Sequence, residues 1–130
     1  ILQMIAQMFC RHMMISVQHA PSEKSQRLKE MLQYIRQHYA ESDLSVEKLC
    51  AYLHLSSTYF STLFKRETGT SFTAYVTTVR MEAAAEAIRG TEEKTYLIAQ
   101  RCGYEDPNYF SYVFKRHFGV TPTKYRSEGK

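Results

Sequence analysis

Apolar residues recur three and four positions apart through most of this 130-residue chain, which is the spacing of one face of an α-helix. No stretch alternates apolar and polar residues for long enough to form a strand. The pattern therefore predicts an all-helical fold. Helices are expected over about 1–16, 24–40, 57–68, 71–89 and 107–118, and shorter ones after Ser45, near Thr95 and after Thr121.

Residues that cap helices mark several of the predicted ends. Ser45 and Ser56 carry hydroxyls that can accept hydrogen bonds from the first amides of a helix. Asp106 does the same directly before a proline, which is tolerated at the first helical position because the missing N–H costs nothing there. Gly69 suits the left-handed position that ends a helix, and Gly90 is expected to stop the helix over 71–89.

One segment of the chain occurs twice. Residues 59–69 (YFSTLFKRETG) return fifty positions later as residues 109–119 (YFSYVFKRHFG). Ahead of each copy lies a short apolar helix and a tight turn, with His54 in the first turn where Gly103 stands in the second. Histidine tolerates a left-handed backbone better than most non-glycine residues. This order of elements is that of a helix-turn-helix unit, which we predict over 45–68 and again over 95–118.

The two units are expected to be tandem, homeodomain-like subdomains joined by a bridging helix over 71–89. At 1.5 Å per residue this helix spans on the order of 27 Å, a little under one turn of B-DNA, so it could hold two recognition helices about one helical repeat apart. We expect residues 24–130 to form this domain. Residues 1–23, an apolar helix and a linker, are expected to be left over from a preceding domain.

The repeated helices have similar polar faces. Apolar residues occupy positions 60, 63 and 64, so the opposite face carries Ser57, Thr58, Ser61, Thr62 and Lys65; in the second copy the same positions hold Pro107, Asn108, Ser111, Tyr112 and Lys115. Hydroxyl and amide groups near the start of a helix suit base edges, and basic groups at its end suit phosphates. A merely solvated surface is the alternative for one such helix, but duplication favours DNA recognition.

Composition narrows the class of protein further. Seventeen Lys and Arg against 13 Asp and Glu give a net charge of +4, all of it within residues 24–130 because Arg11 and Glu23 cancel. This modest basic excess is compatible with a polyanionic partner. Three cysteines favour a reducing compartment, the cytoplasm, over a secreted disulfide framework. No apolar run is long enough to span a membrane. The missing initiator methionine leads us to expect that the chain was cut from a longer protein.

The remaining ionisable residues give no catalytic pattern. Cys10 and His12 are not followed by a second pair at zinc spacing, so the sequence predicts no metal site and no cofactor. The pairs Glu92-Glu93 and Glu105-Asp106 resemble loop and cap charges, not an acid/base couple. We therefore predict that the chain is not an enzyme.

The sequence resembles the C-terminal DNA-binding domain of bacterial AraC/XylS-type transcription regulators over about residues 27–126. The resemblance rests on Ile98-Ala99, Gly103-Tyr104, Asp106, Tyr109-Phe110, Phe114-Lys115-Arg116, Phe118-Gly119, Thr121-Pro122 and Tyr125-Arg126. It implies two helix-turn-helix subdomains bridged by a long helix, each recognition helix entering one of two adjacent major-groove segments. The implied base contacts are Thr58, Ser61, Thr62, Asn108, Ser111 and Tyr112.

We further expect phosphate contacts from cationic side chains and from the starts of the two recognition helices, namely Lys65, Arg66, Lys115, Arg116 and Arg126, together with Ser57 and Pro107. Tyr112 departs from the family pattern, which often has arginine or lysine there. Arg80 matches an arginine of the bridging helix and is either structural or phosphate-facing. The expected partners are double-stranded DNA and RNA polymerase, with a homodimer formed through the missing domain.

A second hypothesis is a helical protein-interaction module whose repeated faces bind partner helices. It would require exposed apolar anchors at i, i+3, i+4 and i+7. The repeated faces carry hydroxyl, amide and basic groups instead, so DNA is favoured. Tyr112 and the apolar helix from Leu2 to Met14 still leave room for a protein contact.

Overall fold

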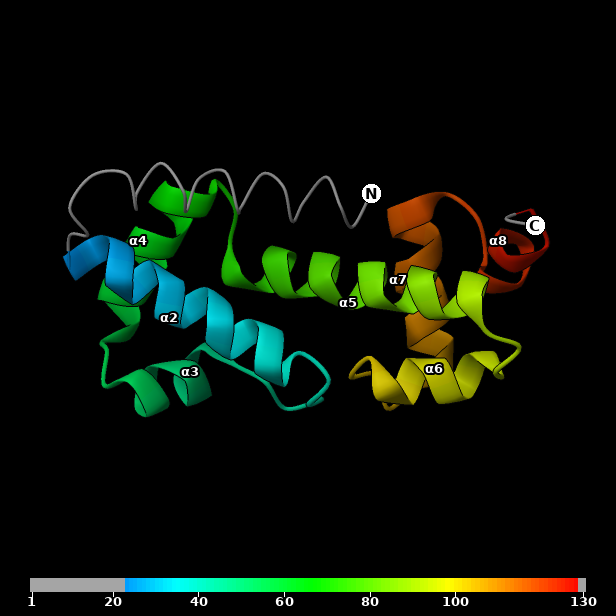
Figure 1. Ribbon diagram of the computed structural model, residues 1–130, viewed down its shortest axis with the longest axis horizontal. Coiled ribbons are helices and arrows are strands. Elements are labelled where there is room, and N and C mark those ends of the chain that lie inside the picture. The colour runs from blue at the N-terminus through cyan, green and yellow to red at the C-terminus, as the bar shows by residue number, and fades with distance from the viewer. Residues whose placement is uncertain (1–22, 129–130) are drawn as a thin grey trace. The chain divides into compact units, whose positions relative to one another are not determined.

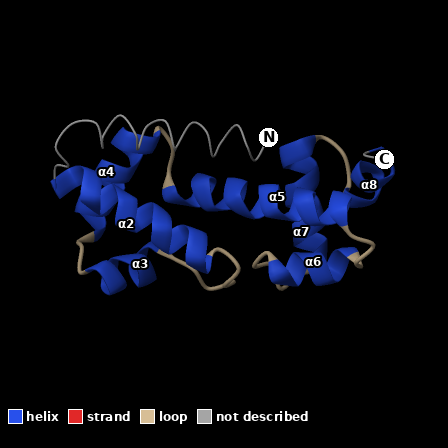
Figure 2. Ribbon diagram, viewed as in Figure 1, coloured by secondary structure: helices blue, strands red, loops and turns tan. Residues whose placement is uncertain are grey.

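The computed structural model describes residues 23–128, and every regular element in that part of the chain is a helix (Figures 1 and 2). The all-helical prediction is confirmed for these residues, whereas the helix predicted over 1–16 lies outside them. The elements are α2 (Glu23–His38), α3 (Val46–Leu53), α4 (Ser57–Thr68), α5 (Phe72–Gly90), α6 (Thr95–Arg101), α7 (Pro107–Phe118) and α8 (Pro122–Glu128).

The described residues form two compact units. The first unit comprises residues 23–38 and 44–76, and the second comprises 39–43 and 77–128. Helix α5 therefore contributes its first residues to the first unit and the rest to the second. The loop 39–43 follows α2 in sequence but belongs to the second unit.

The core of the first unit is built on two phenylalanines of α4. Phe60 and Phe64 are buried, their ring centroids lie 5.2 Å apart, and Phe64 meets Tyr75 edge-on at 5.4 Å. Leu28, Met31 and Ile35 of α2 and Leu49 of α3 are also buried in this unit. Burial of these apolar side chains is what fixes the polar face of α4 on the outside.

The second unit repeats this plan with α7. Phe110 and Phe114 are buried with ring centroids 5.9 Å apart, and Phe114 meets Tyr125 edge-on at 5.3 Å. Helices α5 and α6 contribute Met81, Ala84, Ala85, Ile88, Ile98 and Ala99 to this core, and Cys102, Tyr104 and Val113 complete it. The second unit thus uses a phenylalanine pair and a tyrosine at positions that correspond to those of the first.

The predicted helix caps of the recognition helices are confirmed. Ser56 Oγ accepts from the Tyr59 amide at 3.1 Å, and Asp106 Oδ1 accepts from the Asn108 amide at 2.9 Å. Ser45 caps α3 in the same way. Gly69 ends α4 with a φ of +77°, in the left-handed region that glycine adopts without steric cost.

The structure defines the end and the buried face of α5. The helix ends at Gly90 as expected, without a left-handed residue there, and the amide and hydroxyl of Thr91 both donate to Ala87 O. Val79 and Ala83 are only partly buried. The buried apolar residues that α5 contributes to the second unit are Met81, Ala84, Ala85 and Ile88, because each unit packs against its own segment of the helix.

Arg80 is a structural residue of the second unit. Its Nε donates to Tyr39 O and its Nη2 to Glu41 O, both at 2.8 Å, so it holds the loop 39–43. Its guanidinium also lies 5.4 Å from the centroid of the Tyr104 ring. Of the two roles that the sequence left open for Arg80, the structural one is observed, because its guanidinium binds two backbone carbonyls.

Candidate nucleic-acid interface

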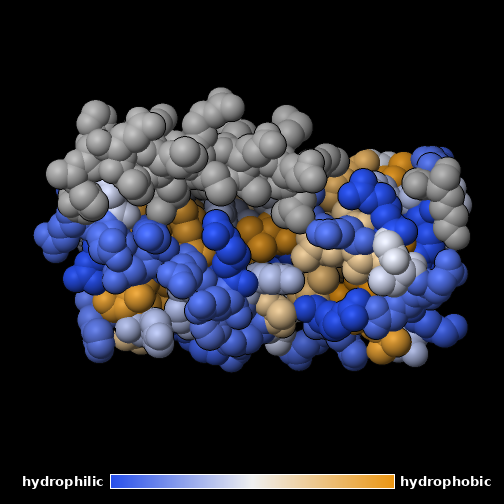
Figure 3. All heavy atoms as spheres, in the orientation of Figure 1, coloured by the Kyte–Doolittle hydropathy of each residue, from blue (hydrophilic) through white to orange (hydrophobic). Residues whose placement is uncertain are grey.

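The polar face of α4 lies on the surface of the first unit. Ser57, Thr58, Ser61, Thr62 and Lys65 are all exposed, while the neighbouring Leu63 and Phe64 are buried. On the face drawn in Figure 3, the described residues are mostly hydrophilic, with smaller hydrophobic areas between them. Helix α4 therefore presents short hydroxyl side chains at its start and cations in its last turn.

The cations at the end of α4 differ in how they are held. Arg66 Nε lies 3.5 Å from Glu67 Oε2, an exposed ion pair that partly offsets its charge. Lys65 lies in the same last turn, where its charge also complements the carbonyl end of the helix dipole. Both side chains are exposed, so a polyanion could reach either of them.

The exposed face of α7 carries two neighbouring rows of side chains, or flanks, that differ in chemistry. One flank carries Asn108, Ser111 and Lys115, which are amide, hydroxyl and ammonium groups. The other carries Tyr109, Tyr112 and Arg116 and is called the aromatic flank below. Asn108, Tyr112, Lys115 and Arg116 are exposed, and Ser111 is half-buried.

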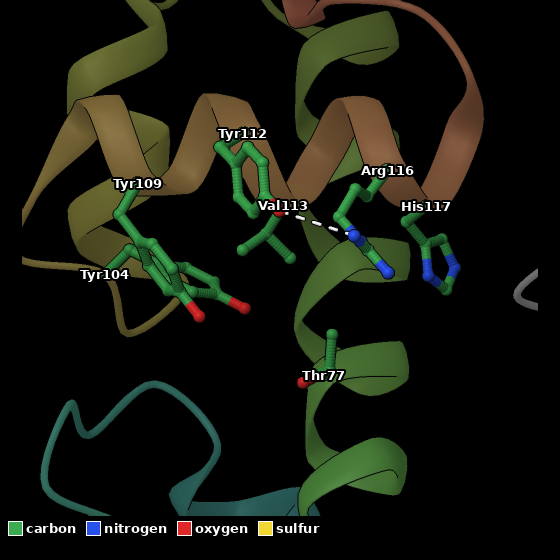
Figure 4. Close-up of a pocket in the computed structure, with 7 residues that line it drawn as sticks. All are labelled: Thr77, Tyr104, Tyr109, Tyr112, Val113, Arg116 and His117. Carbon is green, nitrogen blue, oxygen red and sulfur yellow. Dashed lines mark hydrogen bonds between the residues drawn. The ribbon is translucent and has the colours of Figure 1, made fainter.

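The side chains of the aromatic flank are packed in a row (Figure 4). The rings of Tyr109 and Tyr112 are stacked with centroids 6.3 Å apart, and each residue is 56% exposed. Arg116 Nη1 donates to Tyr112 Oη at 3.3 Å, and the guanidinium carbon lies 5.9 Å from that ring. Buried Tyr104 supports Tyr109 from below at 6.1 Å. The row is therefore anchored in the core of the second unit.

A groove of about 320 Å³ runs beside the aromatic flank. Thr77 of α5, Tyr104, Val113 and His117 complete its lining. Partial burial lowers the pKa of His117 below its usual value, so this imidazole is neutral at neutral pH and Arg116 supplies the positive charge of the lining. A second groove, of about 480 Å³, borders the opposite flank and is lined by Asn108, Ser111 and Tyr96 among others.

Two of the sequence-predicted phosphate contacts do not fit the geometry. Arg126 donates from Nε to Ile88 O at 2.9 Å and from Nη2 to Glu93 O at 2.8 Å, so its guanidinium holds the end of α5 and the following loop. Pro107 has no N–H, and the carboxylate of Asp106 occupies the next amide and adds negative charge there. We omit both from the interface proposed below.

A family model described as "Helix-turn-helix domain" matches residues 49–128, which is more than half of the chain. The solved C-terminal domain of AraT, a response regulator from Geobacillus stearothermophilus, is 40% identical with a TM-score of 0.79, over 82% of this chain and 88% of that one. The chain belongs to the AraC-type helix-turn-helix family.

Two further AraC-type comparisons bear on function. Regulatory protein PocR of Salmonella typhimurium is 34% identical over 108 residues, which are 83% of this chain and 35% of PocR. The DNA-binding domain of the global transcriptional factor AdpA, solved in complex with a target DNA, is 27% identical with a TM-score of 0.72, over 78% of this chain and 90% of that one. The chain thus spans about a third of the length of PocR and most of each solved domain.

The AraC-type assignment makes this chain a DNA-binding domain of a transcription regulator. YisR of Bacillus subtilis, another relative, carries the name of an HTH-type transcriptional regulator. Among residues 23–128, no helix is long and apolar enough to cross a membrane, and no group of His, Cys, Asp and Glu is arranged to hold a metal ion.

Tyr109 is the residue that the sequence analysis missed at this surface. It was treated as part of the family motif, although it lies three positions before Tyr112 and seven before Arg116 on the same helix. That spacing places the three side chains on one side of an AraC-type recognition helix and was already visible in the sequence.

Proposed function

We propose that this domain binds a specific duplex site by placing α4 and α7 in adjacent segments of the major groove. The observation that carries the proposal is the repeated exposure of a polar helix face over a repeated phenylalanine core. The proposed base contacts are Thr58, Ser61 and Thr62 of α4 and Asn108, Ser111 and Tyr112 of α7.

The proposed phosphate contacts are Ser57, Lys65, Arg66, Lys115 and Arg116. All five are exposed, and four of them lie in the last turn of a recognition helix. Contacts of this kind position a protein on the duplex without reading sequence. They also release counterions, so affinity should fall with salt by a log-log slope of about 0.9 per phosphate neutralised.

We also propose partners and a location for the parent regulator. RNA polymerase is a proposed second partner because the relatives regulate transcription. A homodimer is proposed through the rest of the parent protein, since the chain spans 35% of PocR. The proposed location is the cytoplasm, where duplex DNA and polymerase are found.

The experiment that tests the function is selection of bound fragments from random duplex DNA, followed by titration of variants on the selected site. Lys65→Ala should weaken binding to every sequence and reduce the salt slope by about 0.9. Asn108→Ala should relax the preference at one base pair, at a cost of about 1–3 kcal/mol on the preferred site. The Asn108 backbone amide still reaches Asp106 in this variant, so the helix cap is retained.

Lys29→Ala is the matched control, because Lys29 is an exposed lysine of the first unit on α2 and not on α4. It should leave both the affinity and the salt slope near their original values. A uniform loss in Asn108→Ala across mismatched sites would contradict the proposed division of roles. Failure to bind any duplex at low salt would contradict the function itself.

A further inference from the structure

The aromatic flank of α7 exposes the ring carbons of two tyrosines. The major groove of DNA presents few apolar groups that could contact them. Tyr109 and Tyr112 each leave 56% of their area in solvent. Base edges in the major groove present hydrogen-bond donors and acceptors, and the C5-methyl group of thymine is their apolar group. We propose that Tyr109 and Tyr112 form a contact surface for a thymine methyl group, which makes them specificity-determining residues. The inference rests on the proposed function.

The tyrosines of the aromatic flank are held in place by packing, which favours a direct contact with a DNA base over a merely solvated surface. Tyr104 is buried and lies 6.1 Å from Tyr109, which lies 6.3 Å from Tyr112. Arg116 then holds the far end by donating to Tyr112 Oη at 3.3 Å (Figure 4). Each ring is supported on at least one side, so little side-chain freedom is lost when a base is contacted. Such preorganisation lowers the entropic cost of binding.

The hydrogen bond from Arg116 also fixes the orientation of the Tyr112 ring. The hydroxyl oxygen is occupied by the guanidinium, and the guanidinium itself carries the charge that suits a phosphate. The Tyr112 hydroxyl proton and the Tyr109 hydroxyl can still form hydrogen bonds, and the rest of both exposed rings is carbon. The flank therefore offers ring carbon to a methyl group beside its two hydroxyl groups.

The equivalent flank of α4 lacks this arrangement. There Tyr59 is 37% exposed, Thr62 stands at the position of Tyr112, and Arg66 pairs with Glu67 at 3.5 Å. One tyrosine with no second ring beside it on the exposed flank offers less apolar area. We therefore expect the methyl contact in the part of the site that α7 occupies.

The test replaces each thymine of the selected duplex, one at a time, by deoxyuridine, which removes the methyl group and leaves every hydrogen-bonding group. Loss of the contact at one or two positions should lower the affinity of the unmodified protein about fourfold, the value of one buried methyl or methylene group. In Tyr109→Ser/Tyr112→Ser, thymine and uracil should bind equally at those positions. Tyr52→Ser, which removes a 68% exposed tyrosine of α3, should keep the fourfold difference.

A second measurement does not depend on the folding of any variant. 5-Iodo-deoxyuridine, whose iodine occupies the place of the methyl group, is introduced at the sensitive positions and irradiated, and the crosslinked peptide is sequenced. Crosslinking to Tyr109 or Tyr112 supports the proposal, and crosslinking to another residue overturns it. A site bound tightly and with normal salt dependence, but insensitive to every uracil, also overturns it and leaves the proposed function intact. Absence of duplex binding would instead overturn the function.

Discussion

The two helix-turn-helix units share a scaffold and differ in what they expose. Phe60 and Phe64 of α4 correspond to Phe110 and Phe114 of α7, and each pair packs edge-on against one tyrosine. On the outer faces, the short Thr62 of α4 is replaced by Tyr112 of α7. Core positions keep their residue type because a change there costs packing, whereas exposed positions are free to diverge.

The turns show the same contrast in the backbone. The amide of Leu55 donates to Cys50 O in the first unit, and that of Tyr104 donates to Ala99 O in the second, both at 2.9 Å. His54 takes the left-handed position in the first turn with φ +58°, and Gly103 takes it in the second with φ +93°. The same backbone hydrogen bond closes both turns. The two turns therefore differ in the residue at the left-handed position and in the atoms around it.

The largest effect we predict comes from Gly103→Ala. A Cβ atom at this position would lie 2.8 Å from Tyr39 O and 2.9 Å from Arg80 Nε, and the residue would also be held at positive φ. Left-handed strain costs about 1–2 kcal/mol and overpacking costs about 1–3 kcal/mol. Together they should lower the free energy of unfolding by about 3 kcal/mol.

Urea denaturation followed by circular dichroism measures this loss. Gly69→Ala is a suitable control, because it has a similar φ of +77° but no atom within 4 Å of the added Cβ. It should lose only the strain, about 1–2 kcal/mol. Equal losses in the two variants would mean that contact with the loop 39–43 adds nothing to the cost.

The second prediction concerns the pH dependence of stability. It depends on Cys102 of the second unit, whose position in the first unit holds Leu53, a residue without a titratable group. Cys102 is 4% exposed, and desolvation raises the pKa of its thiol from 9.0 to about 11. The folded state favours the protonated thiol, so this contribution to stability is complete below pH 9 and is lost as pH rises toward 11. Between pH 8 and 10.5 the loss should be about 2 kcal/mol.

Urea unfolding at both pH values measures this change, with Cys102→Ala as the comparison. The variant loses some stability at every pH because a small cavity replaces the sulfur. Its decline between pH 8 and 10.5 should nevertheless be about 2 kcal/mol shallower than that of the unmodified chain. Parallel declines would show that lysines and tyrosines, and not the buried thiol, set the alkaline limit.

Most of this fold could be predicted from helical periodicity and helix caps. Ser56 and Asp106 start α4 and α7 as expected, because a capping side chain acts on amides two or three positions away and such short-range contacts are visible in sequence. The exposed faces of α4 and α7 followed from the positions of their phenylalanines for the same reason. The base contacts proposed on those faces stay predictions.

The sequence could not predict a residue's role where a long-range contact decides it. Arg126 was assigned to phosphate by its charge, but Ile88 O and Glu93 O lie within reach only after the second unit folds. Arg80 could be structural or phosphate-facing until Tyr39 O was placed beside it. The spacing of Tyr109 to Tyr112 and Arg116 is visible in the sequence, whereas its support by Tyr104 depends on packing between α7 and the preceding turn.

The smallest predicted effect is that of His54→Gly, which gives the first turn the residue of the second. Glycine removes about 1 kcal/mol of left-handed strain at φ +58°, but it also increases the conformational entropy of the unfolded chain by about 0.4–1 kcal/mol. His54 is exposed, so few packing contacts are lost. The two terms oppose each other, and the free energy of unfolding should change by less than about 0.5 kcal/mol.

A loss above 1 kcal/mol in urea denaturation would mean that the imidazole itself stabilises the turn. The first unit would then have replaced the turn glycine by a residue with a structural role of its own.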